Sequence, residues 1–364
     1  ALTLFGLAST VGFAIWLLAD LFGVVTLPPV GTTVELLGRE FVAGWLEPAT
    51  IPVGSFLGLA FAQAWKSFGL GATFAIVKQA VEPDRLATGF ASTETFRRTA
   101  FLLGPLFAAG VLAVFAFETG FRIVLAVAAA FALGATVAQH FLYDASEDSL
   151  GKSFEGVSTV VADLRAMPTE LRPLLAADTL VRFANGMVYV FFIIVVTEFL
   201  AVGARLPLVG RLSPDAYFGV LLAIEMLVAL AIMIPVSRLS RRIGLKPVVA
   251  LGFAVYAVFP VLLISAPENA TALALLFAFS GLRFAGLPAH KALIVGPAAA
   301  GTGGRVTGSY YLVRNVVVIP SAAIGGAVYA VSPEAAFVGA TAIGLAGLAL
   351  FLVFGREFEA AMAE

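Results

Sequence analysis

Four ionisable residues lie well inside long apolar stretches of the sequence. Lys66 and Arg283 each lie near the middle of such a stretch, and Glu225 and Arg314 each lie nearer the start of one. A charged side chain at membrane depth is costly unless it is paired or hydrated, so such residues commonly serve function. We therefore predict that Lys66, Arg283 and Arg314 bind a substrate and that Glu225 carries a proton.

The first two of these cations begin an internal repeat. Residues 66–77 align without a gap with residues 283–294, at an offset of 217 residues. Small residues follow the cation at helical spacing in each copy: Gly69, Ala72 and Ala75 in the first, and Gly286, Ala289 and Ala292 in the second. The repeat predicts two related halves, with the cation of each half facing one central cavity.

Each of these residues also has a structural interpretation. Lys66 and Arg283 could each hold a helix to its neighbour through carbonyl groups or a carboxylate. Glu225 could form a static salt bridge to a neighbouring arginine instead of carrying a proton. Asp178 and Arg182 lie four residues apart, which places them on one helix face and favours a structural ion pair.

The composition indicates a membrane protein with several spans. Hydrophobic residues make up 60% of the sequence and charged residues 12%, whereas soluble domains are about half apolar and about a quarter charged. The formal net charge of -1 leaves no basic surplus for nucleic acid. With no cysteine, the chain has neither a disulfide nor a thiolate metal site.

The sequence contains no motif of an enzyme. His140 and His290 are far apart, and there is neither a Gly-x-Ser-x-Gly motif nor a phosphate-binding loop. We therefore expect no catalytic residue, no cofactor and no metal site.

Ten apolar segments are long enough to cross a hydrocarbon layer of about 30 Å as helices. They cover residues 2–27, 53–79, 94–116, 121–142, 174–200, 217–237, 247–266, 270–294, 306–330 and 334–354. The shorter stretch 32–47 predicts a helix on the membrane surface. We therefore expect an all-α multi-pass membrane protein.

Three regions follow from this pattern: an N-terminal bundle at 1–143, a cytoplasmic linker at 144–172 and a C-terminal six-helix bundle at 173–364. The linker carries apolar residues at helical spacing, which favours an amphipathic helix over a solvated loop. Lysine and arginine gather in alternate connections, which places those connections and the carboxyl end in the cytoplasm. We expect the chain to lie in the plasma membrane.

The connection at 237–246 resembles the loop signature of the major facilitator superfamily of secondary transporters. It matches Gly-x-x-x-Asp-Arg-x-Gly-Arg-Lys at Arg242, Gly244 and Lys246, and departs from it at Ser237, Arg241 and Leu245. Residues 65–73 are similar to the family's fourth-helix motif, with Lys66 one position from the family's buried arginine. Residues 91–109 are similar to the fifth-helix motif of proton-driven antiporters, including Gly104 and Pro105.

The resemblance implies a fold of six plus six helices, of which this sequence would lack the first two. It implies a gating loop formed by Arg238, Arg242, Gly244 and Lys246, and helix packing at Gly104 and Pro105. It also implies alternating access of two halves around a central site.

The function that the resemblance implies is secondary active transport of a small solute. We expect coupling to a proton or another ion, with efflux as one direction, and a monomer in the lipid bilayer. The surplus of deep cations favours an anionic solute, whereas the 32 phenylalanines would also suit an apolar one. The alternative is a membrane sensor or scaffold that keeps this fold without transport.

Overall fold

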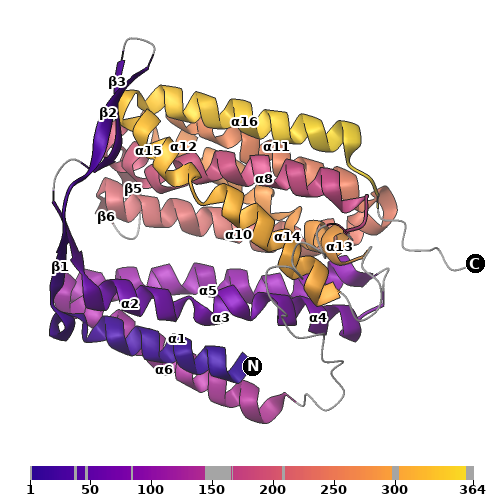
Figure 1. The fold of residues 1–364 in the computed structure, drawn as a ribbon, viewed down its shortest axis with the longest axis horizontal. Helices are drawn as coiled ribbons and strands as arrows, with labels where there is room; N and C mark the ends of the chain where they lie inside the picture. Colours follow the sequence, from indigo (N-terminus) through magenta and orange to yellow (C-terminus); the bar gives the residue numbers. More distant parts are fainter. Residues whose placement is uncertain are drawn as a thin grey trace, which may run out of the picture. The chain divides into compact units, whose positions relative to one another are not determined.

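The computed structural model describes residues 2–36, 39–45, 48–82, 85–143, 165, 167–206, 210–296 and 303–357. These residues form mainly helices, together with three two-stranded antiparallel sheets (Figure 1). Their contacts divide the chain into two compact units. Unit 1 consists of Ala1–Ile76 and Phe107–Leu150, and unit 2 of Val77–Leu106 and Gly151–Glu364.

Unit 1 is built around α1 (Leu2–Leu17), which packs against α2 (Val53–Ala62) and α6 (Phe117–Leu142). Glycine allows the close approach of α1 and α2. A Cβ atom added at Gly12 would lie 2.2 Å from the backbone nitrogen of Ala62. Small residues at helix contacts are typical of helices that associate in lipid, where close backbone approach supplies the packing energy.

Hairpins follow α1 where the sequence predicted helix. Strands β1 (Val24–Leu27) and β4 (Ala49–Pro52) pair with each other, as do β2 (Val30–Leu36) and β3 (Arg39–Trp45). The surface helix expected at 32–47 is therefore wrong, and the first expected span ends before residue 24. β-branched and aromatic residues such as Thr32, Val34 and Phe41 favour extended backbone, which explains the difference.

After the linker region, the described part of unit 2 contains eight helices of nine or more residues. They are α8 (Leu171–Val188), α10 (Pro214–Ile243), α11 (Leu245–Ile264), α12 (Ala270–Gly281), α13 (Leu287–Val295), α14 (Gly303–Val318), α15 (Ser321–Val331) and α16 (Pro333–Phe354). Both α8 and α11 pack against α16 (Figure 1). An apolar core of unit 2 includes Phe192, Phe259, Phe277 and Phe337, each almost fully buried.

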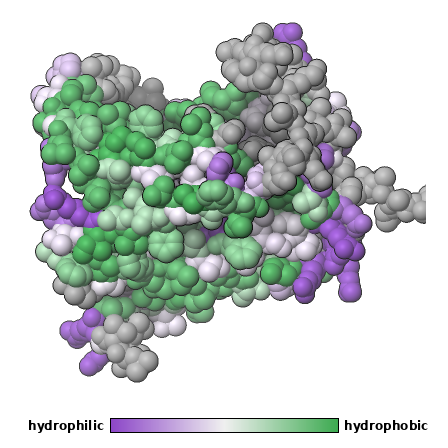
Figure 2. All heavy atoms as spheres, turned by 90° about the horizontal axis from the view of Figure 1, so that it is seen from below, coloured by the Kyte–Doolittle hydropathy of each residue, from purple (hydrophilic) through white to green (hydrophobic). Residues whose placement is uncertain are grey.

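Seven helical segments of the described chain are long and apolar enough to cross a membrane. They are Glu118–Leu142, Leu171–Phe199, Tyr217–Ile243, Leu245–Ile264, Ala270–Val295, Val306–Val331 and Pro333–Phe354. They match the expected span at 121–142 and the six expected after residue 173. Apolar residues also cover much of the face shown in Figure 2. The protein is therefore a helical multi-pass membrane protein, in agreement with the all-α multi-pass chain expected, and it has short hairpins besides its helices.

The other three expected spans differ from the prediction. Helix α1 has 16 residues, which is short for a hydrocarbon layer of about 30 Å. The segment 53–79 is divided into α2, α3 (Ala64–Phe68) and α4 (Leu70–Ala80). Helix α5 (Leu86–Val114) is long enough, but it carries Glu94, Arg97 and Arg98 near its middle. The linker helix expected within 144–172 falls largely outside the described residues.

Candidate functional site

The span Ala270–Val295 is interrupted where it carries Arg283. Helix α12 ends at Gly281, a 3-10 turn covers Leu282–Phe284, and α13 begins at Leu287. Interrupted backbone at membrane depth is tolerated where protein buries it or where it lines a cavity. The interruption in unit 2 satisfies both conditions, because Phe284 is buried and Arg283 lines a cavity.

Arg283 forms a buried ion pair with Glu225 of α10. Its Nη2 atom lies 2.8 Å from Glu225 Oε1, and the two side chains are 5% and 2% exposed. The Ser280 hydroxyl donates a hydrogen bond to the same carboxylate oxygen. Arg283 Nε has no hydrogen-bond partner among the described residues. The sequence had placed both charges inside helices, and the structure brings them into contact.

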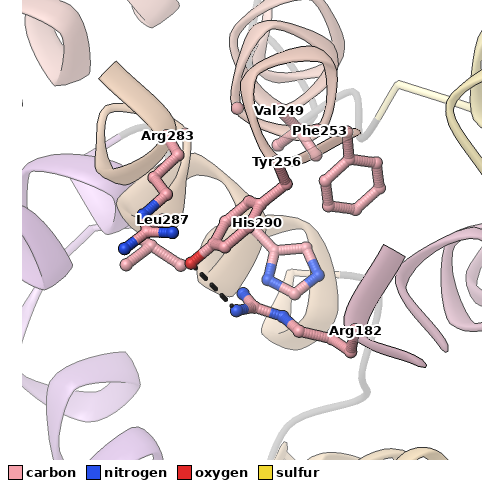
Figure 3. A pocket seen from close by; sticks show the side chains of 9 residues that line it. Arg182, Val249, Phe253, Tyr256, Arg283, Leu287 and His290 are labelled. Carbon is pink, nitrogen blue, oxygen red and sulfur yellow. Dashed lines mark hydrogen bonds between the residues drawn. The ribbon is translucent and has the colours of Figure 1, made fainter. Parts of the chain in front are cut away.

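A small cavity lies beside this pair (Figure 3). Its interior has room for about one water molecule, and it is partly open to the surroundings. Nine residues line it: Arg182, Val249, Gly252, Phe253, Tyr256, Arg283, Gly286, Leu287 and His290. They come from α8, α11 and the interrupted span.

Tyr256 of α11 stands between the two arginines of the cavity. Arg182 Nη1 donates a 3.0 Å hydrogen bond to the Tyr256 hydroxyl oxygen, drawn as a dashed line in Figure 3. The Cζ atoms of Arg182 and Arg283 lie 4.7 and 5.2 Å from the centroid of the Tyr256 ring. A tyrosine face attracts cations, so the ring helps to hold two like charges near one cavity.

Asp178 of α8 gathers three basic side chains. Its carboxylate lies 3.3 Å from Arg182 Nε, 3.1 Å from Arg314 Nη1 and 3.5 Å from His290 Nε2. The Tyr310 hydroxyl donates a further hydrogen bond of 3.2 Å. Asp178 is fully buried, so its charge depends on these partners. The expected pair of Asp178 with Arg182 is confirmed as one contact of a larger network.

Glu94 of α5 forms a second network within unit 2. Lys291 Nζ of α13 lies 2.5 Å from Glu94 Oε1, and Arg97 Nη1 lies 3.2 Å from it. Arg98 Nε lies 3.6 Å from Oε2, and the Arg98 guanidinium lies 3.9 Å above the Phe284 ring. Neither Glu94 nor Lys291 was singled out from the sequence as a candidate site residue. The spacing of Glu94, Arg97 and Arg98 at i, i+3 and i+4 was the signal that could have identified this cluster.

The predicted substrate residues have different surroundings. Arg283 and Arg314 lie inside unit 2, where they form ion pairs with Glu225 and Asp178, respectively. Lys66 is exposed on α3 of unit 1. The central cavity proposed for Lys66 and Arg283, and the proton role of Glu225, stay predictions. Of the small residues after Arg283, Gly286 lines the cavity, whereas Ala289 is packed into an apolar core.

The predicted gating loop forms a sharp connection between α10 and α11. Gly244 has φ 89°, a left-handed conformation that favours glycine. Lys246 Nζ donates a 2.9 Å hydrogen bond to the carbonyl of Leu352, near the end of α16. Arg238 and Arg242 are exposed at the end of α10. A role of this loop in gating stays a prediction.

Gly104 and Pro105 lie within α5 and are exposed. A Cβ atom added at Gly104 would meet no described atom within 4 Å. The helix packing expected at these two residues therefore stays a prediction.

The described residues define a helical membrane protein with a buried charge network beside a small cavity. They include no group of three or more histidines and carboxylates that could hold a metal ion. Compared with known proteins, the chain matches no family model and no curated protein significantly.

Proposed function

We propose that the protein is a secondary active transporter that moves a small solute across the membrane by alternating access. Its motif resemblance to the major facilitator superfamily motivates this proposal. The observation that carries it is the interrupted span Ala270–Val295, which places Arg283 in the wall of a small cavity, where it is buried and paired with Glu225. Discontinuous helices that carry charged groups commonly form the sites of secondary transporters.

An ion pair at this depth serves transport better than it serves stability. Burying both charges costs desolvation energy that their attraction only partly returns, so an apolar pair would stabilise the fold as well. Glu225 and Arg283 also differ in whether they can change their charge. The carboxylate can take up a proton, whereas the guanidinium keeps its charge.

These properties give Glu225 a role in proton coupling. When the Glu225 carboxylate is charged, Arg283 is occupied by it. When Glu225 takes up a proton, Arg283 loses its counter-charge and becomes available to another group. Proton uptake at one side of the membrane would thus alter the site that faces the cavity, which is the requirement for coupling.

The test is transport by Glu225→Gln in the full-length protein reconstituted in liposomes. Glutamine keeps an oxygen that can accept from Arg283 but removes the titrating group. We expect proton-driven accumulation to be lost, while exchange of solute across the membrane continues. Glu268→Gln, at an exposed loop position, is the matched control and should transport normally.

Three results have distinct meanings. Unchanged pH-driven accumulation by Glu225→Gln would remove Glu225 from coupling. A folded protein that shows neither accumulation nor exchange would favour the alternative function, a membrane sensor or scaffold. Loss of proton-driven accumulation in Glu225→Gln, together with normal transport by Glu268→Gln, supports the transporter.

We also propose that the carboxyl end and the cation-rich connections face the cytoplasm of a plasma-membrane protein. The sequence has no cysteine, so single cysteines report their own position. Ser92→Cys and Arg241→Cys, both at exposed positions, should resist an impermeant thiol reagent added to intact cells. Arg205→Cys, exposed on the opposite connection, should react. The reverse pattern would overturn the orientation.

A further inference from the structure

The end of α10 carries three arginines on one helix face, which we call the arginine surface. Arg238, Arg241 and Arg242 are all exposed, and their i, i+3 and i+4 spacing places them side by side. Lys246 follows in the same connection, and none of residues 226–267 is acidic. The chain therefore concentrates positive charge at this end of the helix.

The arginine surface has no partner in the part of the chain that the structure describes. None of its three side chains forms a hydrogen bond, an ion pair or a ring contact there. Arg85, another exposed arginine, pairs with Glu82. The Glu357 carboxylate reaches the same connection as the arginine surface, but it accepts from the backbone nitrogens of Leu245 and Lys246. A counter-charge for the arginine surface therefore has to come from outside these residues.

Three like charges on one helix face repel one another. Cations three and four residues apart make a helix less stable. The helix dipole favours cations in the last turn, where Arg241 and Arg242 lie. This attraction falls off beyond the last turn, so it does not offset the repulsion by Arg238. An anion bound from outside would relieve that repulsion.

The place of the arginine surface along α10 matches the headgroup layer of a membrane. Helix α10 has 30 residues, so it is about 45 Å long. This length exceeds a hydrocarbon layer of about 30 Å, which about 20 residues cross. Glu225 is the only charged residue between Tyr217 and Arg238. The arginines therefore begin where the helix leaves the hydrocarbon.

Apolar side chains adjoin the arginines. Leu239 and Ile243 are 45% and 48% exposed, and Pro235, one turn before Arg238, is exposed as well. An arginine at the membrane interface keeps its charged group among the headgroups while its stem covers apolar surface. A soluble anion would leave the neighbouring leucine and isoleucine in water, whereas a lipid covers them with its acyl chains. The combination favours a lipid as the anion.

We propose that the arginine surface binds the headgroups of anionic phospholipids in the leaflet that meets this end of α10. Guanidinium groups bind phosphate oxygens through paired N–H donors. Basic clusters directly after a membrane span are typical of such binding. The contact anchors the end of the helix that carries Glu225, and it does not depend on what the protein transports.

The test measures which lipids surround this end of α10. Because the sequence has no cysteine, Leu239→Cys carries a single fluorophore beside the arginine surface. The labelled full-length protein is placed in vesicles of phosphatidylcholine and phosphatidylglycerol in equal parts, with bromine on the acyl chains of one lipid or of the other. Bromine quenches the fluorophore on contact. Phosphatidylglycerol should be preferred at least about fivefold, as expected for one cation at a membrane surface.

Variants of the labelled protein identify the charge as the cause. The combined change Arg238→Gln, Arg241→Gln and Arg242→Gln should remove the preference. The corresponding change of all three to lysine should keep most of it, because the charge remains. All three positions are exposed, so both variants should fold, and the melting midpoint checks this. The control is Arg122→Gln, which removes an exposed arginine paired with a carboxylate of unit 1 and should keep the preference.

The proposal is overturned if the two lipids quench the label equally. It is also overturned if the triple glutamine variant keeps the preference, or if Arg122→Gln loses it as fully. Inorganic phosphate that replaces chloride at constant ionic strength should leave the preference unchanged. Loss of the preference in phosphate would assign the arginine surface to a soluble anion and would exclude the lipid.

Discussion

Lys66 in unit 1 and Arg283 in unit 2 begin the two copies of one sequence repeat, yet their surroundings are opposite. The backbone at the repeated glycine is nearly the same, with φ −78° and ψ −15° at Gly69 and φ −75° and ψ −14° at Gly286. Lys66 is exposed, whereas Arg283 is 5% exposed and paired with Glu225. The repeat therefore preserves the local break in the helix but not the environment of its cation.

A carboxylate on another helix accounts for the difference. Glu225 lies on α10 of unit 2, and the position 217 residues before it is Ala8, which cannot pair with a cation. The ion pairs among the described residues of unit 1 are instead exposed. Arg122 contacts Asp20 and Glu118, and all three side chains are at least half exposed. Exposed pairs contribute little to stability, whereas breaking a buried pair is costly.

The largest expected effect separates the two copies of the cation. Arg283→Ala leaves Glu225 buried without its partner and should lower the free energy of unfolding by about 3–5 kcal/mol. Lys66→Ala removes an exposed side chain and should change it by less than about 0.5 kcal/mol. Denaturant unfolding in detergent measures both.

A double variant sharpens the same comparison. Adding Glu225→Ala to Arg283→Ala removes the stranded charge, so the combined loss should be smaller than the sum of the single losses. Equal losses for Lys66→Ala and Arg283→Ala would contradict the difference in burial between the two units.

An intermediate effect tests the close packing of helices at glycine, which the two units share. A Cβ atom at Gly12 of unit 1 would lie 2.2 Å from Ala62 N, and one at Gly325 of unit 2 would lie 1.9 Å from Met187 O. Both distances are too short for packed atoms, so Gly12→Ala and Gly325→Ala should each cost about 1–3 kcal/mol through overpacking. Gly104→Ala, where a Cβ atom meets open space, is the control in the same unfolding assay. A neutral Gly12→Ala would show that only unit 2 depends on close helix packing.

The smallest effect tests what determines the loss of stability when a charged side chain is removed: the burial of that side chain, or the unit in which it lies. Glu357 is an exposed residue of unit 2 whose two oxygens accept 2.8 Å hydrogen bonds from the backbone nitrogens of Leu245 and Lys246. It thereby caps α11, whose preceding residue, Gly244, has no side chain to do so.

Glu357→Ala should therefore cost about 1 kcal/mol, the usual value of a helix cap. Glu357→Gln keeps one acceptor oxygen and should cost less, as judged by melting midpoints of the two variants. A loss as large as that of Arg283→Ala would contradict the view that burial sets the cost.

The spans could be predicted from the sequence because apolar length is a local property. Seven of the expected segments reappear as helices long and apolar enough to cross a membrane. The deep charges Glu225, Arg283 and Arg314 were recognised for the same reason, since each interrupts an apolar run. The hairpin of β2 and β3 was missed because a short, mixed segment has no clear helical or strand period.

Only the tertiary structure decided which charges meet. Lys291 reaches Glu94 across 197 positions of the sequence, and Arg314 reaches Asp178 across 136. Neither pair has a spacing that a sequence pattern could reveal, because the distance between two charges depends on which helices pack together. The sequence indicates that a charged side chain at membrane depth needs a partner. The packing of the helices determines which partner it contacts.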